Sequence, residues 1–191
     1  MKNTPSLFLR FATLLLWLFM AVGLASAGLW WSMNPERGAR WAQRVIDERF
    51  PDVARISPQE LNARLRTPPH GGTPPLLIDV RTPEEQEVST LRGARRVEPD
   101  ATAGTVLEGV DAEQPVVLYC TGGFRAAEMA QRLMQAGHTN VSNLEGGIVG
   151  WANAGFPVEK DGVVVSKVHP YSLLFSRMVK QQQEGVAEAE R

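Results

Sequence analysis

The stretch of the chain best suited to chemistry is VVLYCTGGFR, residues 116–125, which contains the single cysteine of the sequence. Cys120 ends an apolar run and is followed by Gly122, Gly123 and Arg125. Glycines allow a tight turn whose backbone N–H groups point inward, and a helix that begins directly afterwards adds the positive end of its dipole. A cysteine at the base of such an anion-binding turn is stabilised as the thiolate, the nucleophilic form. The pattern therefore predicts nucleophilic chemistry at Cys120.

A structural role for this cysteine is the alternative. Free cysteine is among the most buried residue types, and a cysteine after VVLY would fit the end of a core strand. A core cysteine, however, needs neither an anion-binding turn nor a cation at Arg125. We therefore favour the nucleophile.

Apolar runs around this turn predict the sheet that must position it. LLIDV (residues 76–80) and PVVLYC (115–120) are short and rich in branched apolar side chains, as is typical of strands buried on both faces. GARRV (93–97) predicts a further short strand, and NVSNLEGG (140–147) predicts a strand and a turn.

Helices are predicted between these strands from their caps and their periodicity. Ser57 and Thr82 are each followed by a proline and, three residues on, by Glu60 and Glu85, which is the pattern of a capped helix start. AAEMAQRLMQA (126–136) predicts the helix that follows the cysteine turn. Strands that alternate with helices predict an α/β domain with a mostly parallel sheet flanked by helices.

The amino terminus predicts a separate hydrophobic helix that precedes this domain. FATLLLWLFMAVGLASAGLWW (residues 11–31) contains no charged residue and is long enough to cross a membrane. Lys2 and Arg10 precede it, and ASA at residues 25–27 has the small-residue form of a signal-peptidase site. Residues 1–32 are therefore expected to be a signal peptide or a transmembrane anchor.

The charges around this segment leave the side of the membrane open. Export would place the domain in the periplasm of a bacterium. As an uncleaved anchor in the inner membrane, the segment is followed by more arginines than precede it, which favours a cytoplasmic domain; these are Arg37, Arg40, Arg44 and Arg49. The expected localisation is membrane-anchored or exported.

The remaining chain divides into three parts. An amphipathic connecting helix is expected within residues 33–55, and the α/β domain within 56–160. Residues 161–191 form a C-terminal extension with a polar end that is expected to be disordered. Within this extension, VHPYSLLF (168–175) is expected to pack back on the domain.

Composition excludes several classes of function. The 20 Lys and Arg residues balance the 21 Asp and Glu residues, so the chain lacks the excess of positive charge that is typical of proteins that bind nucleic acid. One cysteine excludes a disulfide framework and a CxxC pair, and the three histidines are far apart in sequence, so no metal site is predicted. No cofactor is predicted.

Several blocks in order resemble a single rhodanese domain, a sulfurtransferase fold. These are LLIDVRTPEE, LRGARRV and VVLYCTGGFRAAEMAQRLMQAGHTNVSNLEGGIVGWANAGFPV, and the resemblance runs from Ile56 to Val158. It implies that Cys120 takes a sulfane sulfur from a donor such as thiosulfate, becomes a persulfide and passes the sulfur to cyanide or a thiol. Covalent catalysis then divides the transfer into two displacements.

The resemblance also implies the roles of the neighbouring residues. Arg125 would close the loop and add positive charge, and Asp79 and Arg81 would brace the loops by hydrogen bonds. The donor's oxygens and the persulfide would be bound by the backbone amides of Thr121, Gly122, Gly123, Phe124 and Arg125.

Two details of the motif refine this expectation. The related cell-cycle phosphatases have five residues between cysteine and arginine, whereas this loop has the four residues 121–124, which favours sulfur transfer. Many rhodaneses have a histidine where this chain has Thr90, so any orienting role of that histidine is absent here.

Two functions of different classes follow. The main hypothesis is a membrane-associated or exported sulfurtransferase that uses a Cys120 persulfide, a small sulfur donor and a thiol, cyanide or protein acceptor. The alternative is a non-catalytic, membrane-tethered rhodanese-like binding module, or a persulfide carrier or thiol sensor whose partner supplies the chemistry.

Overall fold

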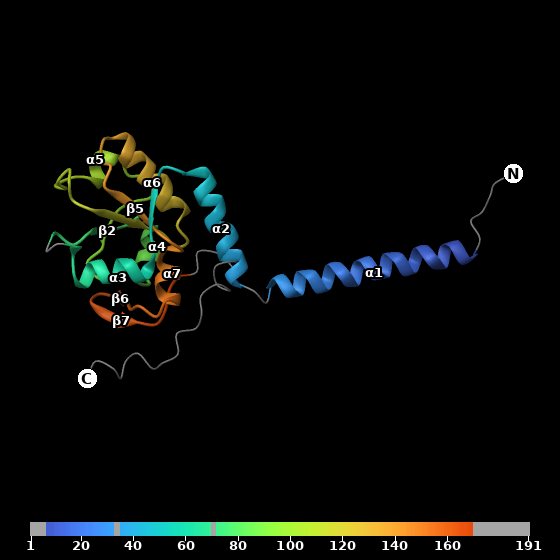
Figure 1. Cartoon of the computed structure of the whole chain (residues 1–191). Helices are drawn as coiled ribbons and strands as arrows, with labels where there is room; N and C mark the ends of the chain where they lie inside the picture. Colours follow the sequence, from blue (N-terminus) through green and yellow to red (C-terminus); the bar gives the residue numbers. More distant parts are fainter. Residues whose placement is uncertain (1–6, 33–34, 70–71, 170–191) are drawn as a thin grey trace. The chain divides into compact units, whose positions relative to one another are not determined.

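A five-stranded parallel sheet forms the centre of the α/β domain in the computed structural model, which describes residues 7–32, 35–69 and 72–169 (Figure 1). The strands lie in the order β1-β5-β4-β2-β3. This arrangement confirms the predicted mostly parallel α/β fold. The strands are β1 Ala54–Ile56, β2 Leu76–Asp79, β3 Arg95–Arg96, β4 Val116–Tyr119 and β5 Val141–Leu144.

Helices connect the strands as their sequence signals predict. Ser57 Oγ accepts a hydrogen bond from the Glu60 N–H at 3.2 Å at the start of α3, and proline occupies the first turn of α3 and of α4. The helices of the domain are α2 Pro35–Arg49, α3 Pro58–Arg66, α4 Pro83–Gln86, α5 Ala103–Val106, α6 Phe124–Gln135 and α7 Gly147–Asn153. An antiparallel hairpin of β6 Val158–Lys160 and β7 Val163–Val165 follows.

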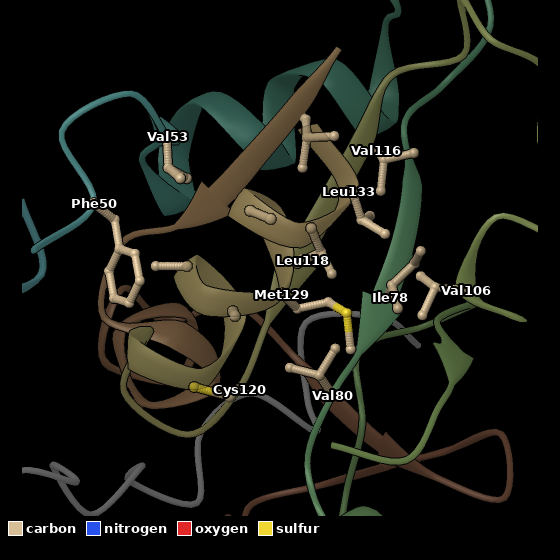
Figure 2. Packing of buried hydrophobic residues seen from close by; sticks show 14 of the residues in the cluster. Phe50, Val53, Ile78, Val80, Val106, Val116, Leu118, Cys120, Met129 and Leu133 are labelled. Atoms are coloured by element: carbon tan, nitrogen blue, oxygen red, sulfur yellow. The ribbon is translucent and has the colours of Figure 1, made fainter. Parts of the chain in front are cut away.

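The alternation of side chains along β4 divides the core into two layers. Val116, Leu118 and Cys120 face one layer, which α2, α5 and α6 cover, and Val117 and Tyr119 face the other, which α3 and α7 cover. The first layer, drawn in Figure 2, contains Ile46, Phe50, Val53, Ile78, Val80, Val106, Met129 and Leu133. The strand period therefore directs the cysteine side chain toward the layer of α6.

The C-terminal extension contributes one buried side chain to the second layer. Val168 is buried against this layer, as expected for a segment that packs back on the domain. The rest of the predicted 168–175 segment, beyond His169, lies outside the described residues.

The amino-terminal unit, Met1–Gly38, is separate from the unit Ala39–Arg191 and contains α1, Leu7–Ser32. Large apolar side chains of α1 are exposed to solvent, with Phe19 the most exposed at 84 %. Within the described ranges, no helix has both the length and the apolar character that crossing a membrane requires. The predicted transmembrane character of residues 1–32 is therefore not confirmed.

Candidate active site

Cys120 directly follows β4, at the carboxyl end of the parallel sheet where helix N-termini point. Its side chain is buried, and the Gly123 N–H donates a hydrogen bond to Cys120 Sγ at 3.1 Å. Gly123 has a φ of 105°, a left-handed conformation in which a residue with a Cβ would be strained. The N-terminus of α6 follows at Phe124, so the turn delivers one backbone amide and the helix dipole to the sulfur.

The first turn of α7 holds the other side of the cysteine loop. The Ile148 N–H donates to the Cys120 carbonyl at 2.9 Å, and the Val149 N–H donates to the Thr121 carbonyl at 3.3 Å. A Cβ on Gly147 would lie 2.2 Å from the Cys120 carbonyl oxygen, so only glycine permits this approach. These two hydrogen bonds hold the start of the cysteine loop against α7.

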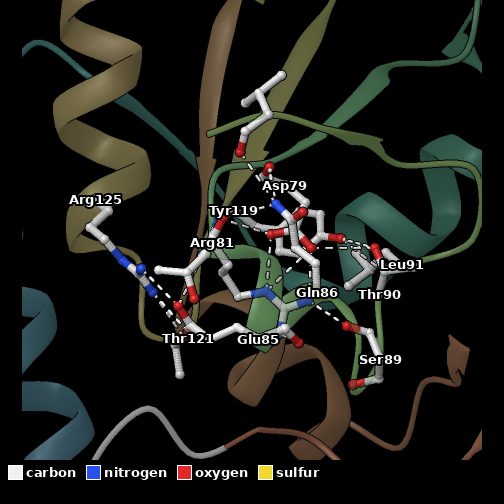
Figure 3. A network of polar contacts seen from close by, with 12 residues as sticks. Asp79, Arg81, Glu85, Gln86, Ser89, Thr90, Leu91, Tyr119, Thr121 and Arg125 are labelled. Carbon is white, nitrogen blue, oxygen red and sulfur yellow. Dashed lines mark hydrogen bonds and ion pairs between the residues drawn. The ribbon is translucent and has the colours of Figure 1, made fainter. Parts of the chain in front are cut away.

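Arg125 and Thr121 are both held by a buried carboxylate, that of Glu85 on α4 (Figure 3). Arg125 donates to Glu85 through both terminal nitrogens, at 2.8 and 2.9 Å, and the Thr121 hydroxyl donates to Glu85 Oε1. Glu85 Oε2 also accepts from the Thr82 N–H at 3.1 Å, as the predicted helix cap requires. We call Glu85, Thr121 and Arg125 the carboxylate clamp.

The carboxylate clamp defines the surroundings of the Arg125 charge. The resemblance implied that Arg125 closes the loop and adds positive charge, and its guanidinium is paired with the carboxylate of Glu85. Burial lowers the pKa of the Arg125 guanidinium, but its hydrogen bonds to Glu85 and Cys120 and the negative charges of both groups outweigh burial and raise it. Arg125 therefore closes the loop, as predicted, while its charge is compensated.

Glu85 is ionised because its partners overcome the penalty of burial. Burial alone would raise the pKa of Glu85, but hydrogen bonds from Arg125, the Thr121 hydroxyl and the Thr82 N–H, with the charge of Arg125, lower it to about 2. A carboxylate with donors on both oxygens has no freedom to turn toward solvent. The clamp is therefore a fixed charge pair beside Cys120.

Asp79 and Arg81 brace the site from below, as the resemblance implied. Both side chains are fully buried, and Arg81 Nη2 and Nε donate to Asp79 Oδ2 and Oδ1 at 2.7 and 2.9 Å. Arg81 also donates to the backbone carbonyls of Glu85 and Ser89. This buried ion pair thus fixes the backbone of the helix that carries the clamp carboxylate.

Thr90, which stands in place of the family's histidine, has a structural role. Its hydroxyl lies 2.7 Å from the Tyr119 hydroxyl and donates to Asp79 Oδ2 at 3.3 Å. Its backbone pairs with Glu159 in an antiparallel bridge. Thr90 therefore connects the brace to the strand that ends at the cysteine.

The remaining predicted site residues lie in the same turn. Gly122 is half-buried. The Phe124 side chain is 46 % exposed at the rim, and its ring packs edge-on against Phe50 at a centroid distance of 5.3 Å. Residues 120–125 are therefore brought together as expected, and their roles in binding a donor stay predictions.

Sequence reasoning missed two residues of the site. Glu85 was predicted only as part of a helix cap. Its pairing with Arg125 could not be predicted from local sequence, because Arg125 lies 40 positions further along the chain. Asn143, at the end of β5, is buried beside Gly123, and neither atom of its carboxamide has a hydrogen-bond partner in the described part of the chain. A polar residue before a buried leucine at a strand end was the available signal.

A cavity of about 620 Å³ lies elsewhere in the domain. Its lining comes from the segments that precede β2 and β4, including Thr73, Pro75, Asp111 and Pro115. In a parallel sheet these segments are at the amino ends of the strands, opposite the edge that carries Cys120. The cavity is therefore separate from the candidate active site.

We expect Asp79→Ala to lower the free energy of unfolding by about 3–5 kcal/mol, because it leaves the buried Arg81 without a counter-charge. Urea unfolding monitored by circular dichroism measures this loss. The matched control is Glu60→Gln, which breaks the exposed ion pair of Glu60 and Arg64, and which we expect to change stability by less than about 0.5 kcal/mol. A loss below about 1 kcal/mol in Asp79→Ala would contradict the bracing role.

Glu85 should make stability depend on acid pH. Its folded pKa of about 2 lies below its ordinary value of 4.5, so the carboxylate stabilises the fold above pH 4.5 and loses that contribution as the pH falls toward 2. We expect Glu85→Gln to reduce stability at pH 7 by about 3 kcal/mol and to flatten the decline between pH 4.5 and 2. Urea unfolding at several pH values measures both, with the exposed Glu87→Gln as control. An unchanged pH profile in Glu85→Gln would refute the assignment.

This chain is similar in sequence to proteins of one family. The model of the rhodanese-like domain matches residues 57–154. A sulfurtransferase from Allochromatium vinosum is 35 % identical over 83 residues, which cover 44 % of this chain and 77 % of that protein. The thiosulfate sulfurtransferase GlpE of Actinobacillus succinogenes is 32 % identical over 84 residues, which cover 44 % of this chain and 75 % of that protein.

A solved structure shows the same fold at lower identity. The thiosulfate sulfurtransferase from Pseudomonas aeruginosa superposes with a TM-score of 0.55 and 20 % identity, over 70 % of this chain and 25 % of that one. The parallel sheet, the cysteine turn at its carboxyl edge and the matched residues 57–154 agree with one another. The chain belongs to the family of rhodanese-like domain proteins.

Proposed function

We propose that this protein is a sulfurtransferase that carries a sulfane sulfur as a persulfide on Cys120. The observation that carries the proposal is the hydrogen bond from the Gly123 N–H to Cys120 Sγ at 3.1 Å, at the start of α6. A backbone amide and a helix dipole stabilise negative charge on the sulfur, and they do so without a general base. The names of its sulfurtransferase relatives support this class of reaction.

The reaction proceeds by two displacements. The Cys120 thiolate attacks the outer sulfur of a sulfane donor; with thiosulfate, the S–S bond breaks and sulfite leaves with the electron pair. The outer sulfur of the resulting persulfide is then attacked by cyanide or a thiolate, and Cys120 leaves as the thiolate. Each step conserves charge and electrons, so no redox partner is needed.

The donor is proposed to be thiosulfate-like, and the acceptor to be a small thiophile or a protein thiol. The short loop between Cys120 and Arg125 supports a sulfur transfer over phosphate chemistry. The similar protein from Actinobacillus succinogenes is a thiosulfate sulfurtransferase, which makes thiosulfate the first donor to test.

The Cys120→Ser variant tests the mechanism. We expect the wild-type chain incubated with thiosulfate to gain one sulfur atom in its intact mass, and to release it as thiocyanate when cyanide is added. Cys120→Ser should gain no sulfur, since a serine hydroxyl at neutral pH is a far weaker nucleophile than a thiolate. Its melting temperature should change little, because the substitution is nearly isosteric.

The other outcomes assign the alternative functions. A persulfide that forms but is not discharged by cyanide would indicate a carrier that needs its own acceptor. A wild-type chain that gains no sulfur would contradict the enzyme and leave the tethered binding module. Sulfur loading in Cys120→Ser would contradict the role of the cysteine itself.

We further propose that residues 1–32 direct the domain to a membrane or across it. The support is the apolar surface of α1, where Leu14, Trp17, Phe19 and Leu24 each expose more than half of their area. Exposed apolar surface of this extent is typical of contact with a membrane or with another protein.

Cell fractionation tests this localisation. The full chain is expected in the membrane or exported fraction, and a chain carrying Leu16→Lys and Phe19→Lys in the cytoplasmic fraction, because lysine in the apolar segment opposes insertion. The amino-terminal sequence of the recovered protein distinguishes cleavage after Ala27 from an uncleaved anchor. Equal distribution of the two chains would disprove the proposal.

A further inference from the structure

The charge of Arg125 is compensated before a donor arrives. Glu85 binds both terminal nitrogens of its guanidinium, and the carboxylate is only 2 % exposed. The loop residues between Cys120 and Arg125 carry no charge. With Cys120 as the thiolate, the side chains of Glu85, Arg125 and Cys120 together therefore carry one net negative charge.

Neighbouring charged residues do not cancel this net negative charge. The Asp79 and Arg81 pair below the clamp is neutral as a unit. Arg49 lies over the Phe50 ring at the rim, 5.8 Å from its centroid, but its side chain is exposed and therefore screened by water and salt. The carboxylate of Glu85 is thus the negative charge that pairs with Arg125 beside Cys120, and it reduces the net positive charge that Arg125 presents there.

A fixed carboxylate discriminates between anions by their charge. In a partly buried site, one unit charge a few ångströms from the donor changes its interaction by about ten- to a hundredfold in equilibrium or rate. A dianion experiences this repulsion twice and a monoanion once. The charge of the donor therefore becomes part of its recognition.

We propose that Glu85 is a specificity-determining residue that withholds the charge of Arg125 from the donor, so that the site favours monoanionic sulfane donors over dianionic ones. This inference rests on the proposed sulfurtransferase function. Thiosulfate and methanethiosulfonate are the matched donors: both offer a sulfane sulfur on an oxidised sulfur, but they carry two charges and one. In each case the Cys120 thiolate bonds to the outer sulfur, the S–S bond breaks, and sulfite or methanesulfinate leaves with the electron pair.

The test compares how fast the two donors load sulfur onto the full-length chain, measured by intact mass. The rate ratio of methanethiosulfonate to thiosulfate is divided by the same ratio for 2-mercaptoethanol, an uncharged thiol that corrects for intrinsic reactivity. We expect the corrected ratio of the wild type to exceed one, and Glu85→Gln to lower it at least about tenfold. Glu87→Gln, which removes an exposed carboxylate just beyond the same helix, should leave the ratio within about twofold.

The ratio separates charge recognition from loop positioning, because a loop that is merely displaced slows both donors alike. A corrected ratio in Glu85→Gln within about twofold of the wild type would overturn the proposal. A wild-type chain that loads sulfur from neither donor would instead refute the proposed function.

If Glu85→Gln does not fold, the double variant Glu85→Met with Arg125→Leu removes both charges and keeps the net charge of the site. The proposal expects its corrected ratio to stay within about threefold of the wild type. A ratio that rises tenfold, with thiosulfate used far less well, would show that the charge of Arg125 does reach the donor, and this would overturn the proposal.

Discussion

The carboxylate of Glu85 is the group on which the geometry of the site depends. It accepts hydrogen bonds from the Thr82 N–H, the Thr121 hydroxyl and the Arg125 guanidinium, and so joins α4, the cysteine loop and α6. Removal of any one partner would leave a buried charge poorly compensated, which is expensive in a protein interior. The carboxylate therefore holds the cysteine loop at Thr121, directly after Cys120, and at Arg125 in the first turn of α6.

The pairing of strands in the sheet fixes the position of the carboxylate clamp. Parallel pairing of β2 with β4 aligns Asp79 with Tyr119, so the brace and the cysteine emerge at the same level of the carboxyl edge. Arg81 then ties the backbone at Glu85 to Asp79, which connects the position of the clamp to the register of the sheet. The position of the Glu85 carboxylate therefore depends on the pairing of strands that are far apart in sequence.

The sequence predicted the parts of this structure that local patterns encode. Apolar runs predicted β2 and β4, and the caps at Ser57 and Thr82 predicted the starts of α3 and α4. Two glycines followed by an arginine predicted the turn after Cys120. Long-range pairing was not predictable in this way. The partner of Arg125 is 40 residues away, and β1, the three residues Ala54–Ile56, is too short and too polar to be recognised as a strand. The role of Asn143 was likewise not identified, because its position beside Gly123 and the lack of a hydrogen-bond partner for its carboxamide among the described residues follow from the folded structure.

Two glycines of the site are required for different physical reasons, and together they explain how the sulfur is stabilised. Gly123 adopts a φ of 105° that turns its N–H toward Cys120 Sγ, whereas Gly147 gives the Cys120 carbonyl access to the start of α7. The Cys120 and Thr121 carbonyls accept hydrogen bonds from α7, and the Gly123 N–H donates to Cys120 Sγ, so the backbone of the loop is bonded on both sides. Dipoles fixed in place favour negative charge on a nearby atom without adding net charge to the site. Under the proposed sulfurtransferase function, the backbone of the loop therefore acts on the sulfur directly, and the carboxylate of Glu85 acts on the charge of Arg125 beside it.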